Sequence, residues 1–205
     1  EVTGSNHFLT TDNSKVIIDC GLFQGHRQDF FEKNSKFDFI PEEIDACILS
    51  HAHIDHSGNI PNLVKQKFGG RIIATDPTRD LCGAMLPDSG HIQESDAEYV
   101  SKLHARKGLP PVKPLYTKEE AERSLEFFSG HPYNQRIKVT YDIDVTFFDA
   151  GHVLGSSTPL LEIGPEGKKV RLAYAVDLGR RNMPILNDPE QPPDIDWLIL
   201  ESTYG

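Results

Sequence analysis

Cysteine, positive charge and long apolar runs are all scarce in this chain of 205 residues. Its three cysteines, Cys20, Cys47 and Cys82, are odd in number and form no C-x-x-C pair, which argues against a disulfide scaffold and a cysteine-ligated zinc site. No apolar run is long enough to cross a membrane, and no segment has the pattern of a signal peptide. The lack of a signal peptide is weak evidence, because the chain begins at Glu1 without an initiator methionine. The simplest interpretation is a cytoplasmic protein with reduced, partly buried thiols and no membrane contact.

Basic residues are outnumbered, because 21 Lys and Arg stand against 31 Asp and Glu and give a formal net charge of −10. A surface with this balance repels phosphate, and phosphate contacts supply most of the affinity in nucleic-acid binding. Local positive groups exist at Arg27, Arg180 and Arg181, but such residues are more often solvated surface charges than phosphate contacts. Charge therefore weighs against a nucleic-acid function, unless bound divalent cations supply the positive charge.

One short segment is rich in metal-binding side chains. Residues 51–56 read His-Ala-His-Ile-Asp-His and follow the apolar run 44–50, which is typical of a buried strand. Open α/β sheets present their sites at the carboxyl ends of such strands, so we expect a ligand-rich loop here. The alternative is a surface histidine cluster that binds nothing, and it is disfavoured because four ligands fall within six residues.

The spacing within this segment predicts two metal sites. In extended backbone His51 and His53 point to the same side, so both imidazoles can reach one ion. Asp55 and His56 come where a helix over 57–68 is expected to begin, which directs them towards a second ion. Histidine and carboxylate together favour zinc, and manganese or iron is less suited.

Two sites need further ligands, and two later strand ends provide candidates. His152 follows the apolar run 145–148 and lies between Gly151 and Gly155, which free the local backbone. Asp177 ends another apolar run in the same way, and its carboxylate could bridge two metals. Taken alone, either would more often be an ordinary strand-end residue. Together with the first cluster they are predicted ligands.

The pattern H-x-H-x-D-H, followed by a strand-end histidine and a strand-end aspartate, resembles the metallo-β-lactamase superfamily. The strand and the Glu-Ser-Thr-Tyr-Gly segment at 196–205 narrow the resemblance, because they are similar to those that precede the inserted domain of the β-CASP nucleic-acid-processing branch. Four other segments are also typical of that branch: 2–6, 18–25, 88–94 and 177–180. The likeness covers essentially the whole chain and is greatest to bacterial and archaeal relatives of the eukaryotic pre-mRNA 3′-end cleavage endonuclease.

The resemblance implies six metal ligands: His51, His53 and His152 on one zinc, Asp55 and His56 on a second, and Asp177 as the bridge between them. Asp19 matches an aspartate that supports the ligands, since a ligating imidazole usually donates its other N–H to a carboxylate or carbonyl. Glu201 matches a glutamate that acts in a general-acid role with a histidine beyond residue 205. Two departures, Asn6 for the usual cysteine and Ala175-Val176 before the bridging aspartate, replace no ligand.

The same resemblance implies a zinc-dependent ribonuclease that cleaves RNA phosphodiester bonds, in RNA processing or decay, with a di-zinc activated hydroxide. Asp55 and Asp177 would orient the hydroxide, and Glu201 would help to protonate the leaving oxygen. Two alternatives stay open: a small-molecule metallo-hydrolase acting on a thioester, lactone or lactam, and a non-catalytic subunit of an RNA-processing complex. The segment 201–205 weighs against a small-molecule hydrolase, because those branches continue without the inserted domain. The intact set of predicted ligands weighs against a non-catalytic subunit.

The chain is expected to be a piece of a longer protein. Residues 1–205 correspond to the N-terminal portion of a single metallo-β-lactamase domain, and neither the β-CASP domain nor the last ligand of the second zinc has a counterpart in them. We expect this piece alone to have an open second metal site, which could leave it inactive. Any homodimer would form through the missing regions.

Strands that alternate with helices predict an α/β fold with mixed sheets, and the resemblance implies an αββα sandwich that is incomplete without its C-terminal return segments. The expected strands are 15–20, 44–50, 71–75, 137–140, 145–149, 158–163, 170–177 and 197–201. The expected helices are 60–68, 77–86, 94–107 and 117–127. Thr117 and Glu120 have the spacing of a capping box, and the turn 164–167 predicts a hairpin. His91 and Glu94 could line the cleft or cap the helix that follows them.

Overall fold

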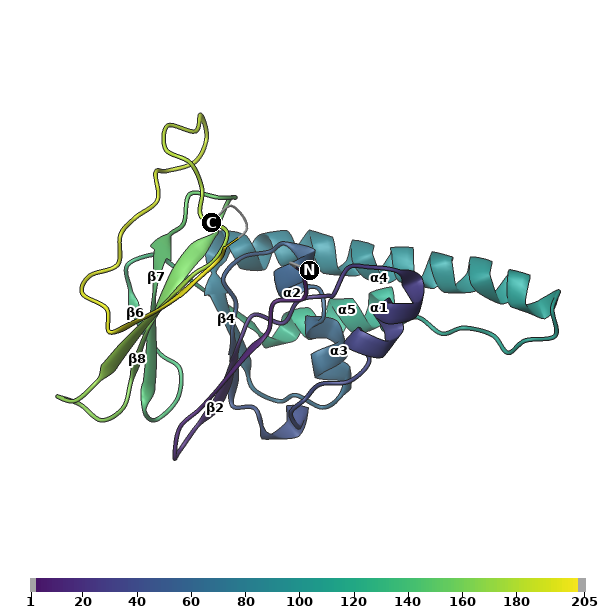
Figure 1. Cartoon of the computed structure of the whole chain (residues 1–205), viewed down its shortest axis with the longest axis horizontal. Helices are drawn as coiled ribbons and strands as arrows, with labels where there is room; N and C mark the ends of the chain where they lie inside the picture. The colour runs from purple at the N-terminus through teal and green to yellow at the C-terminus, as the bar shows by residue number, and fades with distance from the viewer. Residues whose placement is uncertain (1–2, 203–205) are drawn as a thin grey trace.

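Two five-stranded sheets face each other in the computed structural model, which describes residues 3–202 (Figure 1). The first sheet has the order β1 (His7–Thr10), β2 (Lys15–Ile18), β3 (Ala46–Ile48), β4 (Arg71–Thr75) and β5 (Phe128–His131). The second has the order β10 (Trp197–Leu200), β9 (Val170–Ala175), β8 (Ser157–Ile163), β7 (Ile143–Asp149) and β6 (Arg136–Lys138). Each sheet contains parallel and antiparallel neighbours, so the predicted mixed α/β fold is confirmed.

The helices lie on the outer face of the first sheet (Figure 1). They are α1 (Arg27–Asn34), α2 (Ile54–Ser57), α3 (Ile60–Lys65), α4 (Asp76–Ala105) and α5 (Lys118–Ser124), with 3-10 turns at Pro41–Glu43 and Leu125–Phe127. Residues 1–2 and 203–205 lie outside the described part, and so does the side chain of Arg27. The predicted segments 2–6 and 196–205 are therefore described only in part.

Two apolar layers hold the sandwich together. Between the sheets, Ile18 and Ile48 pack against Phe147 and its neighbours, whereas the alternate residue Ile17 packs on the helix side. Successive strand side chains point to opposite faces, so a strand covered on both faces needs apolar residues at every position. All three cysteines are buried and free, as predicted.

The described residues form three of the four layers of an αββα sandwich. No helix within residues 3–202 covers the outer face of the second sheet, where Leu198 is 50% exposed and Leu200 is 54% exposed. No helix in this part of the chain is both long and apolar enough to span a membrane.

The long helix α4 corrects one prediction. Separate helices over 77–86 and 94–107 were wrong, because α4 runs unbroken through Pro87. The Pro-Asp-Ser-Gly sequence reads locally as a turn, but Gly90 lets the helix pack directly against the start of α5, where an added Cβ would lie 2.8 Å from the Lys118 nitrogen. Tertiary packing therefore overrides the local preference of this segment.

Two residues in this helix have different positions from those expected. His91 is exposed in the middle of α4, and the Glu94 carboxylate accepts a hydrogen bond from the Lys118 amide (3.0 Å), so Glu94 caps α5 rather than its own helix. The predicted capping box of α5 is confirmed, since the Thr117 hydroxyl accepts from the Glu120 amide and the Glu120 carboxylate accepts from the Thr117 amide.

Two of the three strands that precede predicted ligands end earlier than the sequence suggested, whereas β7 ends at Asp149 as predicted. Strand β3 stops at Ile48 and β9 stops at Ala175, whereas the apolar runs continue to Ser50 and Val176. The apolar residues that follow these strands are buried in loops, which periodicity cannot distinguish from strand. The ligands thus lie in loops beyond the sheet, where their side chains can converge.

Candidate metal centre

The predicted ligands come from strand ends of both sheets. They lie between β3 and α2 (His51, His53), in α2 (Asp55, His56), between β7 and β8 (His152) and after β9 (Asp177). The two sheets are tied at this edge, because the amide and hydroxyl of Ser157 both donate to the carbonyl oxygen of Ser50 (2.9 and 2.8 Å). Loops from both sheets therefore meet at one place.

Three imidazoles and one carboxylate form a compact group. Nδ1 of His53 lies 3.1 Å from Nε2 of His51 and 3.3 Å from Nε2 of His152. Oδ2 of Asp177 lies 3.2 Å from Nε2 of His51, and one ligand atom from each of these four residues falls within 4.8 Å of the others. Residues from positions 51, 53, 152 and 177 are thus brought together as predicted.

The chemistry of this group fits a bound cation. Burial lowers the pKa of His53 and of His152, and neighbouring histidines lower both further, so each ring favours its neutral form. A neutral imidazole offers the lone pair that a metal needs. Three imidazole nitrogens that face one another, with a carboxylate beside them, are a donor set typical of zinc. His51, His53, His152 and Asp177 could therefore hold one ion.

The remaining two predicted ligands lie beside this group, on the side of Asp177. Nε2 of His56 is 3.4 Å from Oδ2 of Asp177 and 3.9 Å from Oδ2 of Asp55. The same Asp177 oxygen is 3.7 Å from Nε2 of His152, so it lies between the two sets of ligands. Hydrogen bonds from His51 and His56 hold the pKa of Asp177 well below its usual range, which keeps the carboxylate charged.

Asp19 contacts the predicted ligand His56 from a fully buried position. Its Oδ2 accepts hydrogen bonds from His56 Nδ1 (2.6 Å), the Ser50 hydroxyl (2.8 Å) and the Tyr174 hydroxyl (3.0 Å). Its Oδ1 accepts from the Ser50 amide (2.7 Å). The bond to Nδ1 leaves Nε2 of His56 facing Asp177, which is the orientation a metal ligand requires.

Asp19 and Asp177 have left-handed backbone, with φ of 60° and 46°. Residues other than glycine rarely adopt this conformation, and it persists where the surrounding structure holds it in place. Such strain concentrates at functional sites, which agrees with the position of both residues beside the imidazole group.

Two glycines allow the loops of the centre to touch. A Cβ on Gly179 would lie 1.7 Å from the Gly151 carbonyl oxygen, in the loop that carries His152. A Cβ on Gly21 would lie 1.6 Å from the carbonyl oxygen of Asp55. Only glycine permits these approaches, so both positions set the spacing of the ligand loops.

Glu201 lies close to the centre, after β10. Its Oε1 accepts a hydrogen bond from the Leu178 amide (3.0 Å), and its charge acts to raise the pKa of His152. Arg180 and Arg181 are exposed in the loop after Asp177.

The sequence did not point to Ser50 or Tyr174. Ser50 directly precedes His51, which is the one available signal. Tyr174 is 155 positions from Asp19, and its hydroxyl also lies 2.6 Å from that of Ser5. These contacts form only when the two sheets pack, so no local pattern reveals them.

The sequence profile of the metallo-beta-lactamase superfamily matches residues 2–155, the span that includes His51, His53 and His152. The chain belongs to this superfamily. Solved structures agree on the fold: the subclass B3 metallo-beta-lactamase MEM-A1, from a soil metagenome library, aligns with a TM-score of 0.51 and 18% identity over 88% of this chain and 60% of that one. An identity this low shows the fold alone.

The chain is also similar to curated proteins whose names refer to RNA cleavage, transcription termination and polyadenylation. It is 31% identical to ribonuclease TTHA0252 of Thermus thermophilus, 32% to transcription termination factor FttA of Methanocaldococcus jannaschii and 35% to cleavage and polyadenylation specificity factor subunit 3 of Dictyostelium discoideum. Each alignment covers 100% of this chain but only 42%, 30% and 24% of these relatives, in that order. The predicted family is thereby confirmed, and the chain spans less than half the length of these proteins.

Proposed function

We propose that this chain is the metal-binding part of a ribonuclease that cleaves RNA phosphodiester bonds. The observation that carries the proposal is the compact group of His51, His53, His152 and Asp177, in a chain that aligns along its whole length with a ribonuclease. Residues 1–205 would form the N-terminal portion of a single metallo-β-lactamase domain. The three buried free thiols support a cytoplasmic location, where thiols stay reduced.

The donor set supports zinc, with two ions in the complete site. His51, His53 and His152 would hold the first ion, Asp55 and His56 the second, and Asp177 both. Nitrogen and carboxylate oxygen donors suit zinc better than manganese. When bound, the ions supply an activated water and positive charge for the phosphoryl oxygens. That positive charge also offsets the repulsion between RNA and a chain of net charge −10.

Residues of this chain would position the attacking water and the leaving group. The Asp177 carboxylate stays charged because His51 and His56 lower its pKa, so it can accept a hydrogen bond from the attacking water. Asp55, like Asp177, lies beside Nε2 of His56, and its carboxylate would also accept a hydrogen bond from the attacking water. Asp19 fixes the ring of His56, and Glu201, which is bonded to the Leu178 amide, would help to deliver a proton to the leaving oxygen.

The test is cleavage of end-labelled RNA by the full-length protein. Asp55→Ala and His56→Ala should each remove most of the cleavage activity, because each removes a proposed ligand of the second ion. Asp12→Ala, which removes an exposed carboxylate between β1 and β2, should leave the rate unchanged. Cleavage that survived both ligand substitutions and removal of zinc would refute the proposal.

A further inference from the structure

One side-chain hydrogen bond links the two sheets beside the candidate metal centre. The hydroxyl of Tyr174, in β9, donates to Oδ2 of Asp19, which follows β2 (3.0 Å). The same oxygen accepts a hydrogen bond from Nδ1 of His56 (2.6 Å). Tyr174 and Asp19 are both fully buried, so solvent does not compete for their bond. Asp177 comes after β9, and the bond therefore ties the strand that leads to Asp177 to the residue that contacts His56.

Ser5 connects this bond to the other predicted ligand in α2. The Ser5 hydroxyl lies 2.6 Å from that of Tyr174, and because the Tyr174 hydrogen is donated to Asp19, Ser5 is the donor to Tyr174. The Ser5 amide donates to the carbonyl oxygen of Asp55 (2.8 Å). Asp55 and His56, the two residues assigned to the second ion alone, are thus both connected to the Tyr174 hydroxyl through one intermediate residue.

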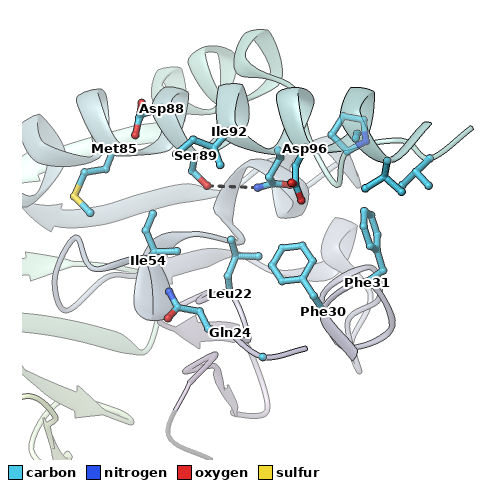
Figure 2. A pocket seen from close by; sticks show the side chains of 16 residues that line it. Leu22, Gln24, Phe30, Phe31, Ile54, Met85, Asp88, Ser89, Ile92 and Asp96 are labelled. Atoms are coloured by element: carbon cyan, nitrogen blue, oxygen red, sulfur yellow. Dashed lines mark hydrogen bonds between the residues drawn. The ribbon is translucent and has the colours of Figure 1, made fainter. Parts of the chain in front are cut away.

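A buried tyrosine that joins two sheets could serve stability alone, and a second tyrosine of this chain provides a comparison. Tyr116 is also fully buried, and its hydroxyl lies 2.9 Å from that of Ser89. Ser89 belongs to α4 and lines a cavity of about 490 Å³ between α4 and the loop that follows β2 (Figure 2). None of the described residues that line this cavity is a predicted metal ligand. The two tyrosine–serine pairs are therefore alike in burial, but only Tyr174 contacts Asp19.

We propose that Tyr174 is a positioning residue for the second metal ion and that it acts through Asp19. A ligating imidazole is oriented by the group that accepts its other N–H, and Tyr174 in turn orients that group. A buried carboxylate also needs hydrogen-bond donors to stay charged. Among the described residues, Tyr174 is the one donor to Asp19 that comes from the second sheet. Without its hydroxyl, Oδ2 of Asp19 would be held less firmly against Nδ1 of His56.

The proposal rests on the proposed function, because it assumes that Asp55 and His56 hold an ion. The experiment titrates the full-length protein with zinc, in competition with a chromophoric chelator and without RNA, and measures the affinity of each site. Tyr174→Phe should weaken the second site about tenfold, the lower end of the effect of such supporting partners, because Asp19 keeps its other donors. The first site should be unchanged. Tyr116→Phe removes an equally buried hydroxyl and should leave both affinities unchanged.

A second background separates positioning from a general loss of stability. If Tyr174 acts through Asp19, Tyr174→Phe should cause no further weakening of the second site in a protein that already carries Asp19→Asn. A role in stability alone would add its own loss there. The affinity of the first site, measured in the same sample, reports whether each variant is folded.

Four results would each overturn the proposal: an unchanged second site in Tyr174→Phe, an equal loss at both sites, the same loss in Tyr116→Phe, or a full additional loss in the Asp19→Asn background. Because no RNA is present, the result does not depend on cleavage. A second ion that binds regardless of Tyr174 would refute this inference and leave the proposed function intact. A second ion that fails to bind the unchanged protein would refute both.

Discussion

Nδ1 of His56 and Oδ2 of Asp19 are 2.6 Å apart, and the Asp19 carboxylate is fully buried. This hydrogen bond fixes the orientation of the imidazole of a predicted ligand through Nδ1, the ring nitrogen that does not face the metal group. Burial lowers the pKa of His56, but hydrogen bonds to Asp177 and Asp19 outweigh that effect and raise it to about 10. Without a cation the ring is therefore protonated, and a metal at Nε2 would take the place of that proton.

Asp19→Asn should weaken metal binding at the second site without preventing it at the first. The amide keeps the shape of the carboxylate but loses its charge, and such supporting partners are worth about 10- to 100-fold in metal affinity. Competition with a chromophoric chelator would measure both sites in the full-length protein. Asp12→Asn on the exposed hairpin is the matched control, and unchanged affinity in Asp19→Asn would contradict the role given to this residue.

Tyr174→Phe should destabilise the fold by about 1 kcal/mol, the usual net value of one hydrogen bond. The Tyr174 hydroxyl joins Ser5 to Asp19, so removal leaves both groups with one partner fewer. Urea unfolding of Tyr174→Phe, Ser5→Ala and the double variant gives the coupling between the two hydroxyls. Strict additivity of the two effects would show that the Ser5 contact carries no stability.

The sequence could predict the residues that the structure brings together, because they are marked by local features. Residues 51–56 are contiguous, and His152 and Asp177 each follow an apolar run, so spacing and strand position sufficed. The resemblance predicts a supporting role for Asp19, but the hydrogen bond from Tyr174 to Asp19 could not be predicted, because it depends on how the two sheets pack.

The secondary structure was missed where local and tertiary preferences disagree. The short edge strands β1 and β5 have too few residues to show alternation, and β5 contains Gly130. Helix α4 passes Pro87 because Gly90 packs on α5, a contact between segments that are distant in the chain. For α4, the deciding interaction lies outside the window that a sequence pattern can cover.

Gly179→Ala should disrupt the centre, since its Cβ would overlap the Gly151 carbonyl oxygen, 1.7 Å away. The loop of Asp177 and the loop of His152 must then separate. We expect a loss of about 1–3 kcal/mol in stability, as in other overpacked sites, together with weaker metal binding. Gly83→Ala is the control, because nothing lies within 4 Å of its Cβ in α4, and it should stabilise the helix by about 0.5–1 kcal/mol. Thermal unfolding of both variants tests the opposite signs, and a stable, metal-binding Gly179→Ala would show that the loops can move apart freely.

Asp144 should make the protein lose stability in acid. Burial raises the pKa of this carboxyl, but hydrogen bonds from Lys169 and Arg136 outweigh burial and lower it below its usual value. A pKa that is lower in the folded than in the unfolded state gives stability that is complete above the unfolded value, about 4, and is lost as the pH falls through the folded value. Asp144→Asn should therefore cost about 1–3 kcal/mol at pH 7, the scale of hydrogen bonds to a charged group, and progressively less below pH 4. Urea unfolding at several pH values measures this difference. A deficit that stayed constant into acid would mean that Asp144 contributes shape rather than charge.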